Sequence, residues 1–453
     1  MTKFFGTDGV RGVAGSFLDV SLAMKLGLYS TYVISRKNTK KIRIVIGKDT
    51  RISSDMLEAA FVSGALSRGA DVITLGVIPT PAVAYMTRKL GADAGVVISA
   101  SHNPMQYNGI KFFNSDGEKL SDEYEEEIEE YLLGNKTIPS QLTGSDIGRL
   151  KSYTGGSNDY LNHAISAAGC DLSGMKIALD CSNGANSFIA PEAFKKLGAE
   201  VFVKSASPDG ININENCGSV HIGSLSEFVR RCKADVGIAF DGDADRVLAV
   251  DENGDPLSGD VLIGLIAMEY KKSGILRGNT VVGTVMSNMG LALTLKEHDI
   301  DFVATKVGDR YVYEKMAQIG GVIGGEESGH IISTLYNTTG DGLVCALEFL
   351  NVLKKSGENA SALRKSITIL PQIVLNAKTN GVNSAEILKD EGLSLLISDL
   401  QNKYSASGRV LIRPSGTEPV IRVMIEGNDK NEMIKDAEKI KDYIETVSLN
   451  LSE

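Results

Sequence analysis

The chain has 453 residues, 43% hydrophobic and 23% charged, with a formal net charge of −10. This length exceeds what one hydrophobic core usually supports, so we expect several folded domains. The acidic balance argues against a general nucleic-acid binder, which needs clustered Lys and Arg. A negatively charged ligand must therefore meet local positive charge.

The N-terminal segment, MTKFFGTDGVRG, has no basic region followed by an apolar run, and no stretch of the chain has the length of a transmembrane helix. We therefore expect a cytoplasmic protein that does not associate with membranes. The five cysteines are scattered and form no CxxC pair, which indicates reduced thiols rather than disulfides or a zinc site. The sequence leaves a monomer and a homodimer equally open.

The first half of the chain alternates apolar, β-branched runs with amphipathic segments, a pattern typical of a mainly parallel sheet. Residues 42–46 predict a strand. A helix is expected to begin near Ser54, where a capping signal occurs, and to end near Arg68. A further strand is predicted from Asp71, and after another helix a strand is predicted to end at Ala100.

Stretches beginning at Lys176 and Asn279 repeat this strand–helix–strand pattern, so we expect three related αβ units. After about residue 370 the pattern changes to a smaller α+β domain. The predicted fold is α/β, with three similar αβ domains containing mixed sheets and a C-terminal α+β domain. The expected domain bounds are 1–155, 156–255, 256–370 and 371–453.

The segment SASHNPMQYNGIKFF, which begins at Ser99, directly follows an apolar strand. Ligands bind beyond the carboxyl ends of parallel strands. A phosphoryl group on Ser101 would bring nearly two negative charges, which His102 or Lys111 could partly neutralise. The alternative is a polar turn without a chemical role.

Asp241, Asp243 and Asp245 lie in a short loop between two apolar strands, with Arg246 directly after them. Three carboxylates this close repel one another unless a cation lies between them, so a divalent metal site is the simplest interpretation. An EF-hand loop is an alternative, but Arg246 stands where that loop needs glycine. A phosphatase with Asp241 as nucleophile and a solvated acidic turn remain as further alternatives.

Two more loops carry polar groups suited to a sugar phosphate. GGVIGGEESGH offers a carboxylate, a hydroxyl and an imidazole on a glycine-rich loop: Glu326, Ser328 and His330. RPSGTEPVIR offers guanidinium groups, hydroxyls and a flexible glycine, which together can form a phosphate-binding loop: Arg413, Ser415, Gly416, Thr417 and Arg422. An ordinary connector and a hairpin turn are the respective alternatives.

Other charged or polar motifs occur near the N-terminus and in the third αβ unit. For each, a surface ion pair is the simpler expectation. These candidates are Thr7, Gly9, Arg11, Lys48, Asp49, Arg51, Lys306 and Arg310.

In chain order, FGTDGVRG, SASHNP, DGDADR, GEESGH and RPSGTEP resemble the motif series of the α-D-phosphohexomutase family, and they extend from one end of the chain to the other. The resemblance implies four domains around a central cleft, with one αβ fold shared by the first three. It also implies that Ser101 is a phosphoserine. Asp241, Asp243 and Asp245 would then hold Mg²⁺ together with a phosphoryl oxygen on Ser101.

The resemblance extends to the remaining site residues. It implies that Glu326 and Ser328 bind the sugar. The phosphate that is not transferred would be bound by Arg413, Ser415, Gly416 and Thr417, and Arg246 and Arg422 would be further substrate contacts. Candidates for the general acid and base are Lys111, Arg11 and His330.

The implied activity is phosphoryl transfer from phospho-Ser101 to glucosamine 6-phosphate. A sugar bisphosphate intermediate then reorients and returns its other phosphate to Ser101, which leaves glucosamine 1-phosphate, a precursor of UDP-N-acetylglucosamine and the cell wall. Reorientation implies movement of the C-terminal domain. Glucose and mannose phosphates are the alternative substrates.

Overall fold

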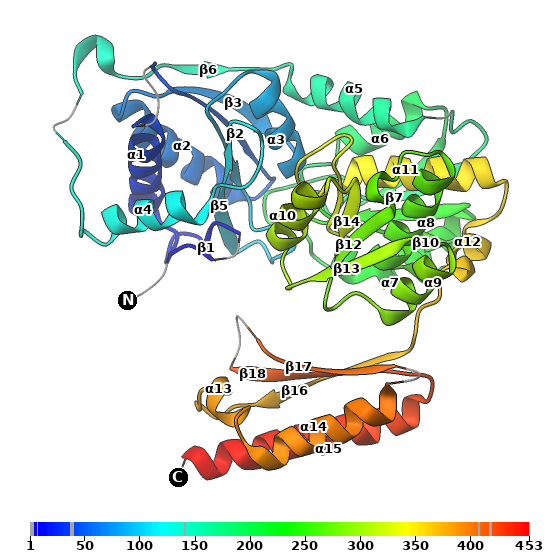
Figure 1. Ribbon diagram of the computed structural model, residues 1–453. Coiled ribbons are helices and arrows are strands. Elements are labelled where there is room, and N and C mark those ends of the chain that lie inside the picture. The colour runs from blue at the N-terminus through cyan, green and yellow to red at the C-terminus, as the bar shows by residue number, and fades with distance from the viewer. Residues whose placement is uncertain are drawn as a thin grey trace. The chain divides into compact units, whose positions relative to one another are not determined.

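The computed structural model describes residues 4–6, 8–36, 40–139, 142–169, 171–405, 408–415 and 419–452. The chain divides into two compact units (Figure 1). The larger unit comprises Met1–Ser287 and His298–Ser366, and the smaller comprises Asn288–Glu297 and Ile367–Glu453. No helix among the described residues combines the length and apolar character needed to cross a membrane.

The first sheet of the larger unit has six strands in the order β1-β5-β4-β2-β3-β6. Strands β2, β3, β4 and β6 are parallel, whereas β5 and β1 are antiparallel to their neighbours. All five residues of β4 are buried, as expected for a strand in a sheet covered on both faces. The elements are β1 (Val10–Val13), α1 (Val20–Ser35), β2 (Arg43–Lys48), α2 (Ile52–Ser67), β3 (Asp71–Val77), α3 (Thr80–Lys89), β4 (Ala94–Ile98), β5 (Tyr107–Asn114), α4 (Asp122–Leu132), η1 (Gly144–Asp146), β6 (Leu150–Ser152) and α5 (Gly156–Ala168).

The second sheet has the strand order β11-β10-β9-β7-β8, and the third has the order β13-β12-β14-β15. Elements of the second are β7 (Lys176–Asp180), α6 (Ile189–Lys196), β8 (Glu200–Lys204), η2 (Ser219–His221), α7 (Ile222–Cys232), β9 (Val236–Phe240), β10 (Val247–Asp251) and β11 (Pro256–Leu257). Those that follow are α8 (Gly259–Lys272), η3 (Arg277–Asn279), β12 (Thr280–Thr284), α9 (Met289–Glu297), β13 (Asp301–Thr305), α10 (Asp309–Ile319), β14 (Ile323–Gly325), β15 (Ile331–Ser333), α11 (Gly342–Ser356) and α12 (Ala360–Ser366).

The three sheets place their polar motifs at equivalent points. In the three sheets, β4, β9 and β14 each run parallel to one neighbouring strand. Each is followed by an antiparallel strand, β5, β10 or β15, and a polar motif lies in the connection between the two. We name these connections the serine loop (99–106, between β4 and β5), the aspartate loop (241–246, between β9 and β10) and the glycine loop (326–330, between β14 and β15). The predicted threefold repeat of an αβ unit is therefore confirmed.

The smaller unit contains an antiparallel sheet with the order β16-β18-β17. Two helices run along one face of this sheet (Figure 1), so the predicted C-terminal α+β domain is confirmed. A short helix is followed directly by a longer one, which begins where the Asp390 side chain accepts a hydrogen bond from Leu393 N. The elements are β16 (Gln372–Lys378), α13 (Ser384–Ile387), α14 (Glu391–Tyr404), β17 (Arg409–Pro414), β18 (Val420–Glu426) and α15 (Lys430–Ser452).

The start of α2 differs from the expectation. The helix begins at Ile52 rather than near Ser54. The Ser54 hydroxyl does not cap the helix but donates a hydrogen bond to Asp49 Oδ1 at 3.0 Å. The prediction that Ser54 caps the helix is therefore wrong, because its hydroxyl binds the buried carboxylate of Asp49.

Candidate active site

Ser101 lies in the serine loop, just beyond the carboxyl end of β4. Its side chain is buried, and its backbone is left-handed, with a φ of 52°. The Ser101 N–H donates to Ser99 Oγ at 2.9 Å, and the Ser101 hydroxyl donates to Asp241 Oδ2 at 2.6 Å. The structure therefore directs this hydroxyl at the aspartate loop rather than at solvent.

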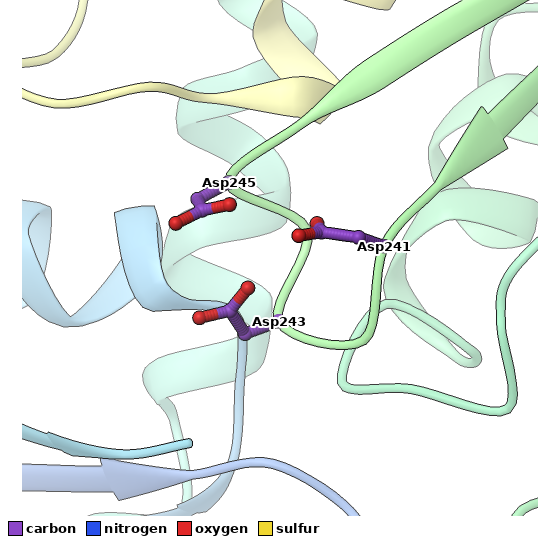
Figure 2. A group of neighbouring side chains, drawn as sticks. All are labelled: Asp241, Asp243 and Asp245. Carbon is purple, nitrogen blue, oxygen red and sulfur yellow. The ribbon is translucent and has the colours of Figure 1, made fainter. Parts of the chain in front are cut away.

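The three carboxylates of the aspartate loop face one another (Figure 2). Asp241, Asp243 and Asp245 are buried and each offers an oxygen within 4.8 Å of the others. Burial, and then the charges of Asp245 and Asp243, raise the pKa of Asp241 well above its usual range. Strands rather than helices flank the loop, which excludes the EF-hand alternative.

The three aspartates together suit a hard divalent cation. Asp243 Oδ1 and Asp245 Oδ1 are buried and have no hydrogen-bond partner among the described residues. Buried carboxylate oxygens without partners are costly unless a cation binds them, and Mg²⁺ prefers oxygen ligands. The geometry thus supports the predicted metal site, with one oxygen from each aspartate.

Lys111, on β5, is the cation nearest to these carboxylates. Its Nζ lies 2.8 Å from Asp243 Oδ2, 3.4 Å from Asp245 Oδ2 and 3.0 Å from Asp8 Oδ2. Although burial opposes it, the charges of Asp243, Asp8 and Asp245 raise the pKa of Lys111. In this arrangement Lys111 stays protonated, so it supplies positive charge and cannot accept a proton.

Two arginines add positive charge to the site, and one of them contacts a histidine. Arg11 forms an ion pair with Asp8, and Arg246 Nη1 lies 3.0 Å from His102 Nδ1. Burial, followed by the Arg246 and Arg11 charges, lowers the pKa of His102 to about 4. His102 is therefore neutral at physiological pH and accepts a hydrogen bond from Arg246.

His330 joins the glycine loop to the aspartate loop. Its Nδ1 lies 3.8 Å from Asp245 Oδ2, and its Nε2 lies 3.2 Å from Asp309 Oδ2. Burial opposes protonation, but the charges of Asp309 and Asp245 outweigh it and raise the pKa of His330. Glu326 is half-buried, and its Oε1 accepts a hydrogen bond from Gly308 N at 3.0 Å, whereas Ser328 is exposed.

The phosphate-loop candidates lie in the smaller unit. Arg413 and Arg422 are directly opposite each other on β17 and β18. Two neighbouring guanidinium groups can bind an anion such as a phosphate together. Ser415 follows β17, while Gly416 and Thr417, like Thr7 and Cys170, lie outside the described residues. The other four cysteines are free thiols, as expected.

The minor candidates fall into two groups. Lys48 and Arg310 form ion pairs with neighbouring carboxylates, and Lys306 is exposed, as expected for surface residues. For Asp49 and Arg51 the surface expectation is wrong, because their ion pair is fully buried at 2.8 Å beneath the serine loop. Gly9 has a φ of 74° and lies close to Ile110 and Lys111, where a side chain would clash.

Four family models together match most of the chain. They describe phosphoglucomutase/phosphomannomutase alpha/beta/alpha domains I, II and III (residues 2–138, 158–254 and 258–369) and the C-terminal domain (372–442). The chain is 51% identical to a phosphoglucosamine mutase from Acetivibrio thermocellus, over 98% of this chain and 99% of the relative. The chain belongs to the phosphoglucomutase/phosphomannomutase family. It is therefore a mutase, and the phosphatase alternative is not supported.

A further relative and two solved structures are also similar to this chain. A phosphoglucosamine mutase from Alkaliphilus oremlandii is 49% identical over 96% of both chains. A phosphoglucomutase/phosphomannomutase family protein from Burkholderia thailandensis has the same fold, with a TM-score of 0.82 and 23% identity over 99% of this chain and 98% of that chain. The N-acetylphosphoglucosamine mutase from Aspergillus fumigatus, solved with GlcNAc-6P and magnesium, gives a TM-score of 0.71 at 17% identity over 98% and 96%.

The structure of this mutase brings together Ser101, Lys111, Arg11, His330, Arg246 and the three aspartates. Sequence reasoning missed two contributors. Asp8 lies beside Lys111 and Arg11, although it belongs to the quoted FGTDGVRG motif. Thr80 donates from its hydroxyl to Asp243 Oδ2 at 2.7 Å, and no sequence pattern near Thr80 indicates this contact.

Gly242 permits the close approach of the serine and aspartate loops. A Cβ at this position would lie 2.7 Å from Ser101 O and 2.7 Å from Ile213 Cδ1. We expect Gly242→Ala to separate the loops, destabilising the mutase by about 1–3 kcal/mol and lowering its activity at least about tenfold. Thermal melting and a mutase assay measure both effects. Gly223→Ala, where a Cβ meets nothing within 4 Å, is the control, and equal behaviour of the two variants would contradict the prediction.

Proposed function

We propose that this mutase interconverts glucosamine 6-phosphate and glucosamine 1-phosphate, and that Ser101 carries the transferable phosphoryl group. The observation that carries the proposal is the 2.6 Å hydrogen bond from Ser101 Oγ to Asp241, within a group of three buried carboxylates suited to a metal. Relatives about half identical over nearly the full chain are named phosphoglucosamine mutase, which supports the amino sugar as substrate.

In the first step, the C1 hydroxyl oxygen of the sugar attacks the phosphorus on Ser101, and the bond between phosphorus and Ser101 Oγ breaks. The hydroxyl proton passes to a base, while Ser101 Oγ takes up a proton. Lys111, His330 and Arg11 are the candidates for proton transfer, and the raised pKa of Lys111 keeps it protonated, so it cannot be the base. The product of this step is a sugar bisphosphate.

In the second step, the reoriented bisphosphate presents its 6-phosphate to Ser101. The Ser101 oxygen attacks that phosphorus, loses its proton and regains a phosphoryl group, while O6 of the sugar takes up a proton. Bound by Asp241, Asp243, Asp245 and a phosphoryl oxygen on Ser101, Mg²⁺ would neutralise charge on the transferring group. Arg246 adds positive charge beside the same carboxylates.

Sugar and phosphate recognition are assigned to the other two loops. Glu326 and Ser328 bind sugar hydroxyls, since they offer a carboxylate and a hydroxyl on a glycine-rich turn and neither side chain is fully buried. The guanidinium groups of Arg413 and Arg422 lie on neighbouring strands and can bind a phosphate together, which supports binding of the phosphate that is not transferred. Ser415, Gly416 and Thr417 share this role by their position in the family motif.

A coupled assay with glucosamine, glucose and mannose 6-phosphates tests the substrate. We expect kcat/KM for glucosamine 6-phosphate to exceed the other two values at least about tenfold, a difference that corresponds to a single charged or polar contact. Equal values for the three sugars would contradict the assignment to glucosamine and leave the mutase activity in place.

A further inference from the structure

The buried Arg51 side chain binds the main chain of the serine loop. The Arg51 guanidinium donates hydrogen bonds to three loop carbonyls and to the carbonyl of Tyr107, the first residue of β5. Nη2 contacts Ser101 O at 3.0 Å and Asn103 O at 2.8 Å, and Nη1 contacts Pro104 O at 2.6 Å and Tyr107 O at 3.0 Å. Arg51 belongs to the first αβ unit, as the loop does, so these bonds fix the loop within its own unit.

Asn214, from the second αβ unit, contacts two of the same carbonyls. Its Nδ2 donates to Ser101 O at 2.8 Å and to Asn103 O at 3.1 Å. The side chain is buried, and its Oδ1 accepts no hydrogen bond from the described residues. Both hydrogen bonds that this amide donates therefore go to the serine loop, across the junction between two αβ units.

Hydrogen bonds also hold the segment around Asn214 to the first αβ unit. Thr50 Oγ1 donates to Asn183 O at 2.6 Å, and Ile52 N donates to Gly210 O at 2.9 Å. The Asn214 N–H donates to Ser182 O at 2.9 Å. The amide is thus presented to the serine loop by a backbone that has little freedom to move away.

Ser101 needs such support because its backbone is left-handed, a conformation that costs free energy for a residue with a Cβ. The carbonyl of Ser101 belongs to the peptide plane that follows the residue. Donors on this oxygen therefore fix ψ of Ser101 and, with it, the direction of the side chain. Phosphoryl transfer depends on this direction, because the attacking oxygen, phosphorus and leaving oxygen must lie in line.

We propose that Asn214 is a positioning residue for phosphoryl transfer. Its amide, together with the Arg51 guanidinium, clamps the Ser101 and Asn103 carbonyls from two αβ units and keeps Ser101 Oγ directed at the aspartate loop. This inference depends on the proposed role of Ser101 as phosphoryl carrier. Asn214 does not itself contact the reacting oxygen, so it acts through the loop.

Asn214→Gly removes the amide while keeping a residue that tolerates the left-handed backbone at this position, where φ is 60°. Asn216→Gly is the matched control, since Asn216 lies in the same segment with a φ of 52° and its side chain is exposed. Single-turnover transfer from the phosphorylated enzyme to glucosamine 6-phosphate is followed by rapid quench. Intact mass spectrometry counts the phosphoryl groups, and thermal melting reports the fold.

We expect Asn214→Gly to transfer roughly ten- to a hundredfold more slowly than the wild type, with KM within about twofold. The Asn216→Gly rate should stay within about twofold of the wild-type rate. A purely structural role would lower the melting temperature and leave the rate per phosphorylated, folded molecule unchanged. If Asn214→Gly does not fold, Asn214→Asp keeps the side-chain shape without a donor and should show the same loss of rate.

The two proposals fail in different ways. A wild-type enzyme without a phosphoryl group, or an active Ser101→Ala variant, would contradict the role of Ser101. If the wild type is phosphorylated and both Asn214→Gly and Asn214→Asp transfer at the wild-type rate, only the positioning role of Asn214 is overturned.

Discussion

Ser101→Ala is expected to reduce kcat by at least about a thousandfold, because it removes the oxygen that carries the phosphoryl group between half-reactions. The fold should persist, since the alanine loses one hydrogen bond to Asp241 and introduces no clash. Intact mass spectrometry should find one phosphoryl group on the wild type and none on the variant, and a coupled assay measures kcat.

Ser99→Ala is the informative comparison for this result. Ser99 offers a second hydroxyl in the same loop, but that hydroxyl donates to Asp49 Oδ2 at 2.7 Å and accepts from the Ser101 N–H. It serves as a buried support, so Ser99→Ala should still carry one phosphoryl group. Retained mutase activity in Ser101→Ala, or loss of the phosphoryl group only in Ser99→Ala, would refute the assignment.

Removal of the divalent metal should abolish turnover, and added Mg²⁺ should restore it. Asp245→Asn is expected to lower kcat at least about a hundredfold even with Mg²⁺ present, because it removes one of three carboxylate ligands. Mg²⁺ at a hundred times its dissociation constant should stabilise the wild type by about 2.7 kcal/mol, through binding to the folded state alone. This stabilisation should be much smaller in the variant.

In the absence of metal, replacing one of the three aspartates should not lower the stability of the protein. The three carboxylates repel one another, and the pKa of Asp241 is raised by burial and by Asp245 and Asp243. Asp241→Asn should therefore melt no lower than the wild type in chelator, while its activity is lost. Asp146→Asn, at an exposed carboxylate, is the control for both melting and activity. A metal-free Asp241→Asn protein that melts well below the wild type would argue that the aspartates stabilise the fold rather than bind a cation.

The αβ architecture could be predicted because its signals are local. Each buried strand is a short apolar run, and each polar loop begins where such a run ends. The aspartate loop is the clearest case, since its three carboxylates and both flanking strands lie within sixteen consecutive residues, Val236–Asp251. The C-terminal unit was equally visible as a change of pattern near residue 370.

What the sequence could not reveal are contacts between distant segments. Thr80 contacts Asp243, and Asn214 contacts Ser101, only after the first two αβ units have packed together. The burial of the Asp49–Arg51 pair has the same origin, because its hydrogen-bond partners lie about fifty residues further along the chain. At Ser54 the local capping signal is overridden, because the hydroxyl bonds to the nearby Asp49 and accepts a hydrogen bond from the distant Asn108.

The equivalent placement of the serine, aspartate and glycine loops on three copies of one sheet has an evolutionary consequence. Under the proposed function, each copy contributes a different ingredient of the reaction, so the copies have specialised rather than duplicated one another. Sugar selectivity can then diverge through the short turn between β14 and β15 while the nucleophile and the metal ligands, on separate copies, are held constant. A substitution in one of these loops can therefore change one property of the catalyst without displacing the groups that the other two loops supply.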